Sequence, residues 1–245
     1  MTTLPVLYED ADIVAVNKPA GLVTHAAGTL RSLGEEGQKL EPTAEDWFKE
    51  KYPEALLERP YVHRLDRDTS GVLVFAKNEA AHEFLRKAFT DREVQKTYLA
   101  LVYGVPKEKK GVIEFAIGRS RKDFRLRSAQ PKAKGRLREA ITHYEVIGEA
   151  EEGSERYALL KVEPETGRTH QIRVHLKAIH HPIVGDKLYG PHSVRALGSH
   201  PIGIDRLALH AAEIDLPLPS GTRVHIEAPL PPELASIFAL FPNAC

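Results

Sequence analysis

Short apolar stretches rich in β-branched and aromatic residues predict eight β-strands along the chain. Each stretch is bounded by turn-forming residues, which is typical of strands. Most neighbouring stretches have no helical segment between them, so the pattern favours an antiparallel or mixed sheet over a parallel strand-helix repeat. The predicted strands are 13–17, 72–76, 97–103, 112–117, 141–147, 157–163, 207–214 and 223–227.

Helical periodicity predicts two amphipathic helices in the first part of the chain. Range 44–52 follows Thr43, and Asp46 stands three residues later, as in a capping box. Range 79–89 follows Asn78, a good N-cap residue, and its apolar residues recur every four positions. We expect the apolar face of this second helix to pack in the core.

A third helix is predicted over about 169–179. Its apolar positions are Ile172, Leu176 and Ile179, which we expect to point inward. Three further residues of this helix, His170, Arg173 and Lys177, are expected on a different, polar side.

Length and composition suit a single folded domain. The chain has 245 residues, of which 42% are hydrophobic, so it can bury a substantial core. We expect one catalytic domain spanning residues 1–245, acting as a monomer. Its single cysteine, Cys245, allows no intramolecular disulfide and no thiolate metal cluster, which favours a cytoplasmic setting.

No stretch resembles a targeting signal or a membrane span, since none approaches the ~20 apolar residues that a spanning helix needs. Neither a GxxxxGK[ST] nor a GxGxxG pattern occurs in the sequence. We therefore expect no membrane association and no nucleotide cofactor.

Charge is balanced overall but unevenly distributed. The chain has 34 Lys and Arg against 34 Asp and Glu, yet the range 107–138 holds twelve basic residues against three acidic ones. Within it Arg119, Arg121, Arg125 and Arg127 alternate with other residues as on one face of a strand, where guanidinium groups can fork onto phosphate oxygens. The alternative is an ordinary solvated segment.

Two polar clusters are candidates for chemistry. Residues 63–71 bring two carboxylates, two guanidinium groups and an imidazole into a loop before the apolar strand 72–76. Residues 167–176 place Arg173 three positions after His170 at the start of the third helix. A carboxylate in a pocket that excludes water needs a nearby cation to stay ionised, and a fixed Arg can supply it. The alternatives are a salt-bridged surface turn and an ordinary surface ion pair.

Two other chemistries are less well supported by the spacing. The histidines at 170, 175, 180 and 181 lack the HExxH arrangement of a zinc site, so we expect no metal and interpret them as polar helix residues that face a polyanion such as RNA. A hydrolase triad of Ser70, His63 and Asp66 would lack the GxSxG elbow, and its members stand too close in sequence.

HRLDRDTSGVLVFAK (63–77) resembles the signature motif of the RluA-type RNA pseudouridine synthases. Four further segments resemble motifs of that family in the same order: LYEDADIVAVNKPAGLVTH, KTYLALVYG, GRTHQIRVHLKAIHHPIVGDKLYG and RLALHA. The resemblance implies an α+β fold with a mixed, largely antiparallel sheet divided by a central cleft and flanked by helices and loops. It also implies RNA as the partner, no cofactor, and a uridine flipped out of the RNA stack for reaction.

Residue roles follow from the same resemblance. Asp66 matches the catalytic aspartate, Tyr98 the tyrosine that packs on the target base, and Arg173 the arginine that pairs with the aspartate. Arg64 matches a residue that helps to hold the site vacated by the flipped base. We expect the remaining substrate contacts from the two motif clusters and the basic segment, namely His63, Arg67, Arg168, His170, Arg121, Arg125 and Arg127.

The expected function is conversion of a specific uridine to pseudouridine in structured rRNA or tRNA. The alternative is a non-catalytic RNA-binding or ribosome-assembly factor that retains the fold. Larger members of the family carry an RNA-binding module before the catalytic domain. Because the KPxG turn begins within twenty residues of Met1, we expect that module to be absent and the range 107–138 to supply phosphate contacts.

Overall fold

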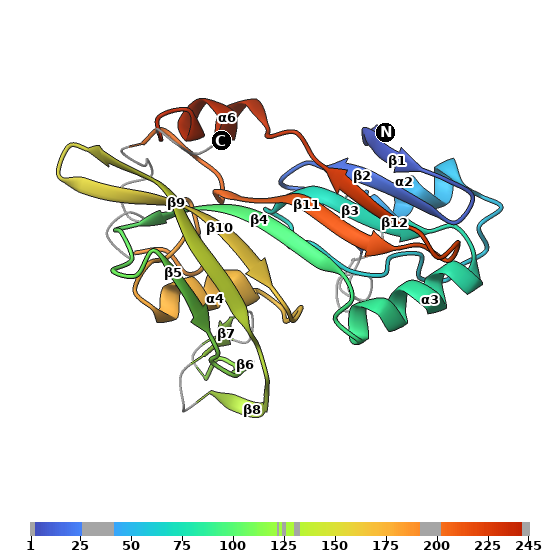
Figure 1. The fold of residues 1–245 in the computed structure, drawn as a ribbon, viewed down its shortest axis with the longest axis horizontal. Helices are drawn as coiled ribbons and strands as arrows, with labels where there is room; N and C mark the ends of the chain where they lie inside the picture. Colours follow the sequence, from blue (N-terminus) through green and yellow to red (C-terminus); the bar gives the residue numbers. More distant parts are fainter. Residues whose placement is uncertain are drawn as a thin grey trace, which may run out of the picture. The chain divides into compact units, whose positions relative to one another are not determined.

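The computed structural model describes residues 3–25, 42–121, 123, 126–129, 133–191 and 202–241. The chain divides into two compact units. The first consists of Met1–Val94 and Glu213–Pro229, and the second of Gln95–Ala212 and Leu230–Cys245. Helices and mostly antiparallel strands confirm the predicted α+β class (Figure 1).

In the first unit the strands follow the order β1-β2-β3-β11, with antiparallel pairing of β1 to β2, of β2 to β3 and of β12 to β11. β3 is buried at every residue, as its continuous apolar sequence predicts. Among the strands of the first unit, the sequence pattern missed only β1, which is four residues long and partly exposed. The strands are β1 (Val6–Glu9), β2 (Ile13–Lys18), β3 (Ser70–Ala76), β11 (Leu209–Pro217), whose last five residues lie in this unit, and β12 (Arg223–Glu227).

Two helices of the first unit begin at the predicted caps. α2 (Ala44–Lys51) starts at Thr43, whose hydroxyl accepts from the Asp46 N–H at 3.1 Å, and the Asp46 carboxylate accepts from the Thr43 N–H at 2.9 Å. α3 (Glu79–Thr90) starts at Asn78 and buries Leu85 against the strands. Both capping predictions are confirmed.

In the second unit the strands follow the order β11-β4-β10-β9-β5, and β4, β10, β9 and β5 pair antiparallel with their neighbours in that order. Its core contains the buried middle of β10 together with residues of α4 and α6. The strands are β4 (Gln95–Tyr103), β5 (Lys110–Ile113), β9 (Thr142–Glu152), β10 (Glu155–Pro164) and the first four residues of β11. The helices are α4 (Gln171–Ala178) and α6 (Pro232–Phe238), and α6 was not predicted.

A separate three-stranded sheet, with the order β7-β6-β8, also belongs to the second unit. It consists of β6 (Ile117–Arg119), β7 (Arg127–Ser128) and β8 (Lys134–Arg138). The single strand predicted over 112–117 was therefore wrong, because the chain leaves one sheet after Ile113 and joins the other at Ile117. Between them the Phe115 carbonyl bonds to the His175 ring at 2.8 Å and not to a strand.

Within the described ranges, no helix is long and apolar enough to span a membrane.

Candidate active site

Asp66 lies in the loop that leads into β3, and its side chain is partly exposed. The residue before it, Leu65, is buried and is held by the hydroxyl of Thr24. That hydroxyl donates to the Leu65 carbonyl at 2.9 Å and accepts from the Leu65 N–H at 3.2 Å. Both backbone groups of Leu65 are thereby satisfied by one side chain, which fixes the chain just before Asp66.

The residue after Asp66 is fixed by the KPxG turn. The Arg67 carbonyl accepts from the Gly21 N–H at 2.9 Å and from the Lys18 ammonium at 3.1 Å. In return Arg67 Nε donates to the Gly21 carbonyl at 3.0 Å. Lys18 is completely buried and also donates to the carbonyls of Pro19 and Leu22. The 18–24 turn therefore holds both neighbours of Asp66, a role of Lys18 and Thr24 that the sequence pattern did not reveal.

His63 has a structural contact that was not predicted. Its Nε2 accepts a hydrogen bond from the Val74 N–H at 3.0 Å, and its ring stacks on Phe89 at 5.1 Å between centroids. An Nε2 that accepts carries no proton, so the ring in this arrangement is the neutral Nδ1–H form. Ser70 is fully buried in β3. Since His63 Nε2 already accepts from the backbone, the arrangement argues against the Ser70–His63–Asp66 triad. Arg64 is exposed on the same loop.

Tyr98 stands on β4 opposite Val162 and packs, partly buried, against the core of the second unit. Lys96 lies two residues earlier on the same strand, so its side chain points to the same face of the sheet. Burial lowers the pKa of Lys96 to about 8. This amine is a feature that sequence reasoning missed, because burial at one strand position cannot be read from KTYLALVYG.

Arg173 on α4 forms a buried ion pair with Asp186. Arg173 Nε donates to Asp186 Oδ2 at 2.8 Å, and Nη2 donates to Oδ1 at 2.9 Å. The alternative that Arg173 forms an ordinary surface ion pair is wrong, because only 5% of its side chain is exposed. A guanidinium can be buried at this position because a carboxylate of matching geometry is buried with it.

Asp186 is itself held by the backbone that follows it. Its Oδ1 also accepts from the N–H groups of Leu188 and Tyr189, each at 2.9 Å. Burial alone would raise the pKa of Asp186, but the hydrogen bonds and charge of Arg173 and the two N–H groups outweigh it and lower that pKa below its ordinary value. Asp186 therefore stays ionised and fixes the orientation of the Arg173 guanidinium.

His170, at the start of α4, adopts a left-handed backbone conformation with φ of 57°. Its Nδ1 lies 2.8 Å from the Tyr189 hydroxyl, which also accepts from the Arg127 N–H at 2.8 Å. The Arg173 guanidinium lies over the Tyr189 ring, 5.1 Å from its centroid. Tyr189 thus links α4 to the three-stranded sheet.

Two other polar residues of α4 are buried. Gln171 accepts from the Thr166 hydroxyl at 2.7 Å and from the Arg168 N–H at 3.0 Å, which shapes the turn before the helix. His175 is fully buried between Thr142 Oγ1 and the Phe115 carbonyl. The interpretation of the 170–181 histidines as RNA-facing was therefore wrong for His175. Burial lowers the pKa of His175, outweighing the opposing hydrogen bond to Phe115.

The same histidines do not assemble into a ligand set. In the part of the chain that the structure describes, no three His, Cys, Asp or Glu side chains come together in an arrangement able to hold a metal ion.

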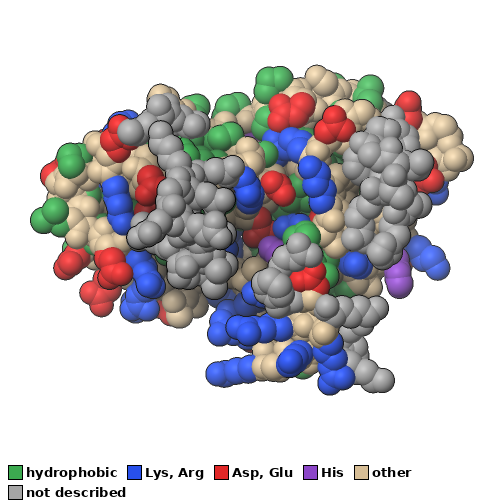
Figure 2. Space-filling view, turned by 180° about the vertical axis from the view of Figure 1, so that it is seen from behind, with side chains coloured by type: hydrophobic (Ala, Val, Ile, Leu, Met, Phe, Trp, Pro, Cys, Tyr) green, Lys and Arg blue, Asp and Glu red, His purple; other side chains and the backbone are tan. Residues whose placement is uncertain are grey.

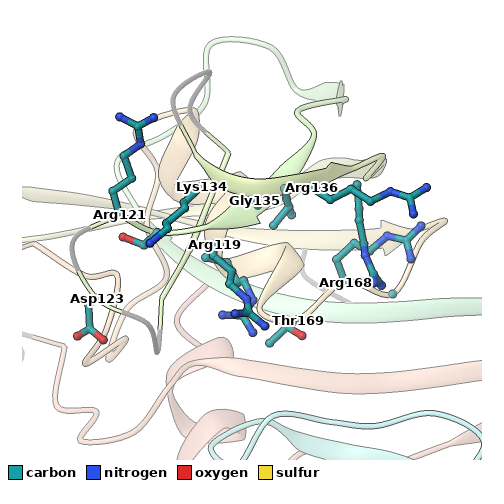
Figure 3. Close-up of a pocket in the computed structure, with 14 residues that line it drawn as sticks. Arg119, Arg121, Asp123, Lys134, Gly135, Arg136, Arg168 and Thr169 are labelled. Carbon is teal, nitrogen blue, oxygen red and sulfur yellow. The ribbon is translucent and has the colours of Figure 1, made fainter.

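The three-stranded sheet and the 167–169 turn enclose a pocket of about 700 Å³ (Figure 3). Arg121, Arg127 and Arg168 line it, as does a single carboxylate among the described residues, that of Asp123. Lys and Arg side chains gather over this sheet on the face seen in Figure 2. Arg125 lies outside the described residues.

Asp66, Arg64, His63 and Arg67 belong to the first unit, whereas Tyr98, Arg173, His170 and the basic pocket belong to the second. Each group is internally ordered by the contacts above. A common site formed by the two groups stays a prediction.

The sequence profile of the family described as RNA pseudouridylate synthase matches residues 12–178, which include Asp66, Tyr98 and Arg173. The chain belongs to this family, whose members are isomerases.

Individual relatives agree with this assignment. The chain is 36% identical over 236 residues to the uncharacterized RNA pseudouridine synthase YlyB of Bacillus subtilis, covering 96% of this chain and 71% of the relative. It is also 36% identical to tRNA pseudouridine synthase C of Pasteurella multocida, covering 86% and 85% of the two chains. The structure of human RNA Pseudouridylate Synthase Domain Containing 1 is similar, with a TM-score of 0.75, 28% identity, and coverage of 98% and 88%.

Proposed function

We propose that this protein converts a specific uridine of structured tRNA or rRNA to pseudouridine, with Asp66 as the catalytic carboxylate. The observation that carries the proposal is the Asp66 loop, in which both neighbouring residues are bonded to the 18–24 turn. A catalytic group must be held in its productive geometry by surrounding contacts. Asp66 has such a support and keeps a partly exposed side chain.

The reaction needs a carboxylate and a pocket but no electron carrier. The bond between ribose carbon 1′ and uracil nitrogen 1 breaks, and a bond from carbon 1′ to uracil carbon 5 forms. The proton on carbon 5 is lost and nitrogen 1 gains one, so the product is an isomer and nothing is oxidised. Asp66 acts as nucleophile or base in this reaction, and Tyr98 packs against the detached uracil so that the uracil stays in the pocket.

Arg173 is proposed to keep Asp66 ionised and oriented. Support comes from the fork with Asp186, which fixes two of the guanidinium nitrogens while the planar group stays charged. A guanidinium held in this way can present a further N–H to a second carboxylate, because it has five donors.

A target uridine must leave the stack of bases to reach a carboxylate inside a protein. We propose that Arg64 and His63 help to hold the vacated position, and that Arg67, Arg168, His170, Arg121, Arg125 and Arg127 contact the RNA. Exposure of Arg64 and the place of Arg121, Arg127 and Arg168 in the basic pocket support these roles. The tRNA pseudouridine synthase C of Pasteurella multocida makes tRNA the first substrate to test.

The test is conversion of unmodified tRNA and rRNA by the purified protein, read by mass-spectrometric mapping of pseudouridine. The wild type should form pseudouridine at one or a few positions. Asp66→Asn should bind the same RNA and form none, because the amide is nearly isosteric yet cannot act as nucleophile or base.

The matched control is Asp68→Asn, which removes a carboxylate two residues away in the same loop. This control should retain turnover. Pseudouridine formed by Asp66→Asn would overturn the role of Asp66. RNA binding by a wild type that forms no pseudouridine in any RNA would instead favour the non-catalytic RNA-binding factor.

A further inference from the structure

Four cations of the basic pocket have not yet been assigned individual roles. Arg119 stands on β6, and Lys134, Arg136 and Arg138 stand on β8, where every residue is exposed. All four line the pocket together with the 167–169 turn. In Figure 3, Arg119 points toward Thr169, whereas Arg121 points away from them.

The strand register places like charges opposite one another. Arg119 is the partner of Arg127 on β7 and of Lys134 on β8, so three cations form one row across three strands. Like charges directly opposite each other on a sheet repel and destabilise it. A row of this kind is unfavourable for the isolated protein and becomes favourable when an anion lies along it.

Several cations elsewhere in the same unit form ion pairs with glutamates. Lys109 pairs with Glu149, Lys110 with Glu145 at 2.9 Å, and Lys161 with Glu163 at 3.0 Å. By contrast, none of the four pocket cations forms an ion pair within the ranges that the structure describes. Among the described residues of the range 107–138, cations around β5 are therefore paired with glutamates, whereas Arg119, Lys134, Arg136 and Arg138 are not.

We propose that this pocket binds phosphodiester groups of the RNA strand outside the target nucleotide, through Arg119, Lys134, Arg136 and Arg138. The inference rests on the proposed function, which supplies the RNA. Neighbouring strands lie about 4.8 Å apart, so the three-cation row spans roughly 10 Å. Successive phosphates of a DNA strand rise by about 3.4 Å per step, and a row of roughly 10 Å is long enough to contact more than one phosphate of a nucleic-acid strand.

The pocket is also positioned to align the RNA with the helix that carries Arg173. The Tyr189 hydroxyl bonds both to the Arg127 N–H of β7 and to His170 at the start of α4. Ile117 and Val174 pack in one cluster with Tyr189. A phosphate bound on the three-stranded sheet therefore has a fixed position relative to α4. Phosphate contacts of this kind fix the register of the RNA on the protein without reading the RNA sequence.

The experiment measures binding of unmodified, fluorescently labelled tRNA transcripts over a series of salt concentrations, with all variants carrying Asp66→Asn so that no turnover occurs. The pocket variant is Lys134→Ala with Arg136→Ala. Each lost phosphate contact should lower the slope of log affinity against log salt by about 0.7 to 0.9, hence by roughly 1.4 to 1.8 for two.

The matched control is Lys109→Ala with Lys110→Ala, which changes the net charge equally in the same unit but removes cations already paired with glutamates. Its slope should stay close to that of the parent. Equal changes in the two double variants would mean that only net charge matters, and an unchanged slope in the pocket variant would overturn the site.

A second measurement needs no substitution and so does not depend on a variant folding. Acylation of lysines in the unaltered protein, read by mass spectrometry, should show Lys134 protected by bound tRNA and Lys109 not protected. Equal protection of both, or of neither, would contradict the proposal. Tight, saturable binding of tripolyphosphate that RNA does not displace would show a small-molecule pocket instead.

The two proposals fail separately. Absence of pseudouridine in the turnover assay would remove the enzymatic function while leaving the binding slopes valid. Normal pseudouridine formation with unchanged slopes would remove the phosphate site alone.

Discussion

The guanidinium of Arg173 donates two parallel hydrogen bonds, of 2.8 and 2.9 Å, to the carboxylate of Asp186, and both side chains are buried. The pair joins the family's helix motif to the segment HPIVGDKLYG, which follows it in the sequence. Asp186 is consequently a positioning residue for Arg173.

Asp186→Asn should unfold more easily and lose turnover. The amide cannot hold the guanidinium as an ion pair, and breaking a buried pair typically costs about 3–5 kcal/mol of the free energy of unfolding. The control is Asp215→Asn, whose partner Arg223 is exposed and whose loss should cost at most about 1 kcal/mol. Urea unfolding and pseudouridine formation measure the two effects. Equal losses in both variants would contradict the special role of the buried pair.

The same pair predicts the effect of acid. Because the pKa of Asp186 is lowered in the folded protein, its stabilising contribution is present above the ordinary carboxyl value of about 3.9 and is lost as pH falls through the folded pKa. The difference in unfolding free energy between wild type and Asp186→Asn should therefore be largest at neutral pH and shrink below about pH 4. A difference that stays constant with pH would show that the pair contributes through packing alone.

Gly185→Ala should destabilise the second unit severely. Gly185 has a φ of +73°, and an added Cβ would lie 1.8 Å from the Arg206 carbonyl oxygen, so the backbone itself must move. Gly203 has a φ of +71° with nothing within 4 Å, which makes Gly203→Ala the matched control. The control should lose about 1–2 kcal/mol from the left-handed conformation, and Gly185→Ala clearly more. Thermal unfolding measures the stability of both variants. Similar losses of stability would contradict the close approach of Gly185 to the Arg206 carbonyl.

Thr24→Val should reduce turnover more than RNA binding. Valine keeps the shape of the side chain but leaves the buried Leu65 N–H and carbonyl without their partner, at a cost of about 1–3 kcal/mol. Thr90→Val is the control, because its hydroxyl bonds only within α3 at the surface. The ratio of kcat to RNA affinity is the measurement. A Thr24→Val protein with wild-type kcat would mean that Asp66 needs no support from this side.

Lys96 should react as an unusually acidic amine. With its pKa lowered to about 8 by burial, the pH profile of its acylation should have a midpoint near 8, whereas ordinary lysine amines titrate near 10.4. Lys96→Met should also raise stability at pH 7, because burial no longer opposes a charge. Mass spectrometry of brief acylation across pH measures the profile, and a midpoint near 10 would contradict the effect of burial.

The sequence predicted those elements whose residues alternate or repeat regularly. The capping residues Thr43 and Asn78 start α2 and α3 as expected, and the range predicted as 223–227 is the observed β12. By contrast β8 was missed because all five of its residues are exposed and three of them are cationic, so no apolar pattern marks it. The periodicity of apolar residues along a sequence marks a strand or helix only where that element packs on a hydrophobic core.

Within the candidate site, the sequence motifs identified residues but not their partners. Arg173 was singled out, yet its bond to Asp186 depends on how the segment after α4 folds back. His175 looked like a surface histidine, and its burial against Phe115 follows from a kink between β5 and β6 that no local pattern indicates. Contacts between segments far apart along the chain, such as that of Thr24 with Leu65, have no signal in a single sequence.

The first unit is discontinuous, and this has a consequence for synthesis on the ribosome. Residues 1–94 emerge first, but the strands that complete their sheet, the end of β11 and all of β12, belong to residues 213–229. The core of the second unit in turn includes Leu234 and Phe238 of α6, which are translated after residues 213–229. Until β11 (Leu209–Pro217) has been translated, β3 lacks its neighbour on that side and presents an unpaired edge to other nascent chains. Both units therefore wait for residues 209–238 before their strand pairing and core are complete, so they cannot fold one after the other in the order of synthesis.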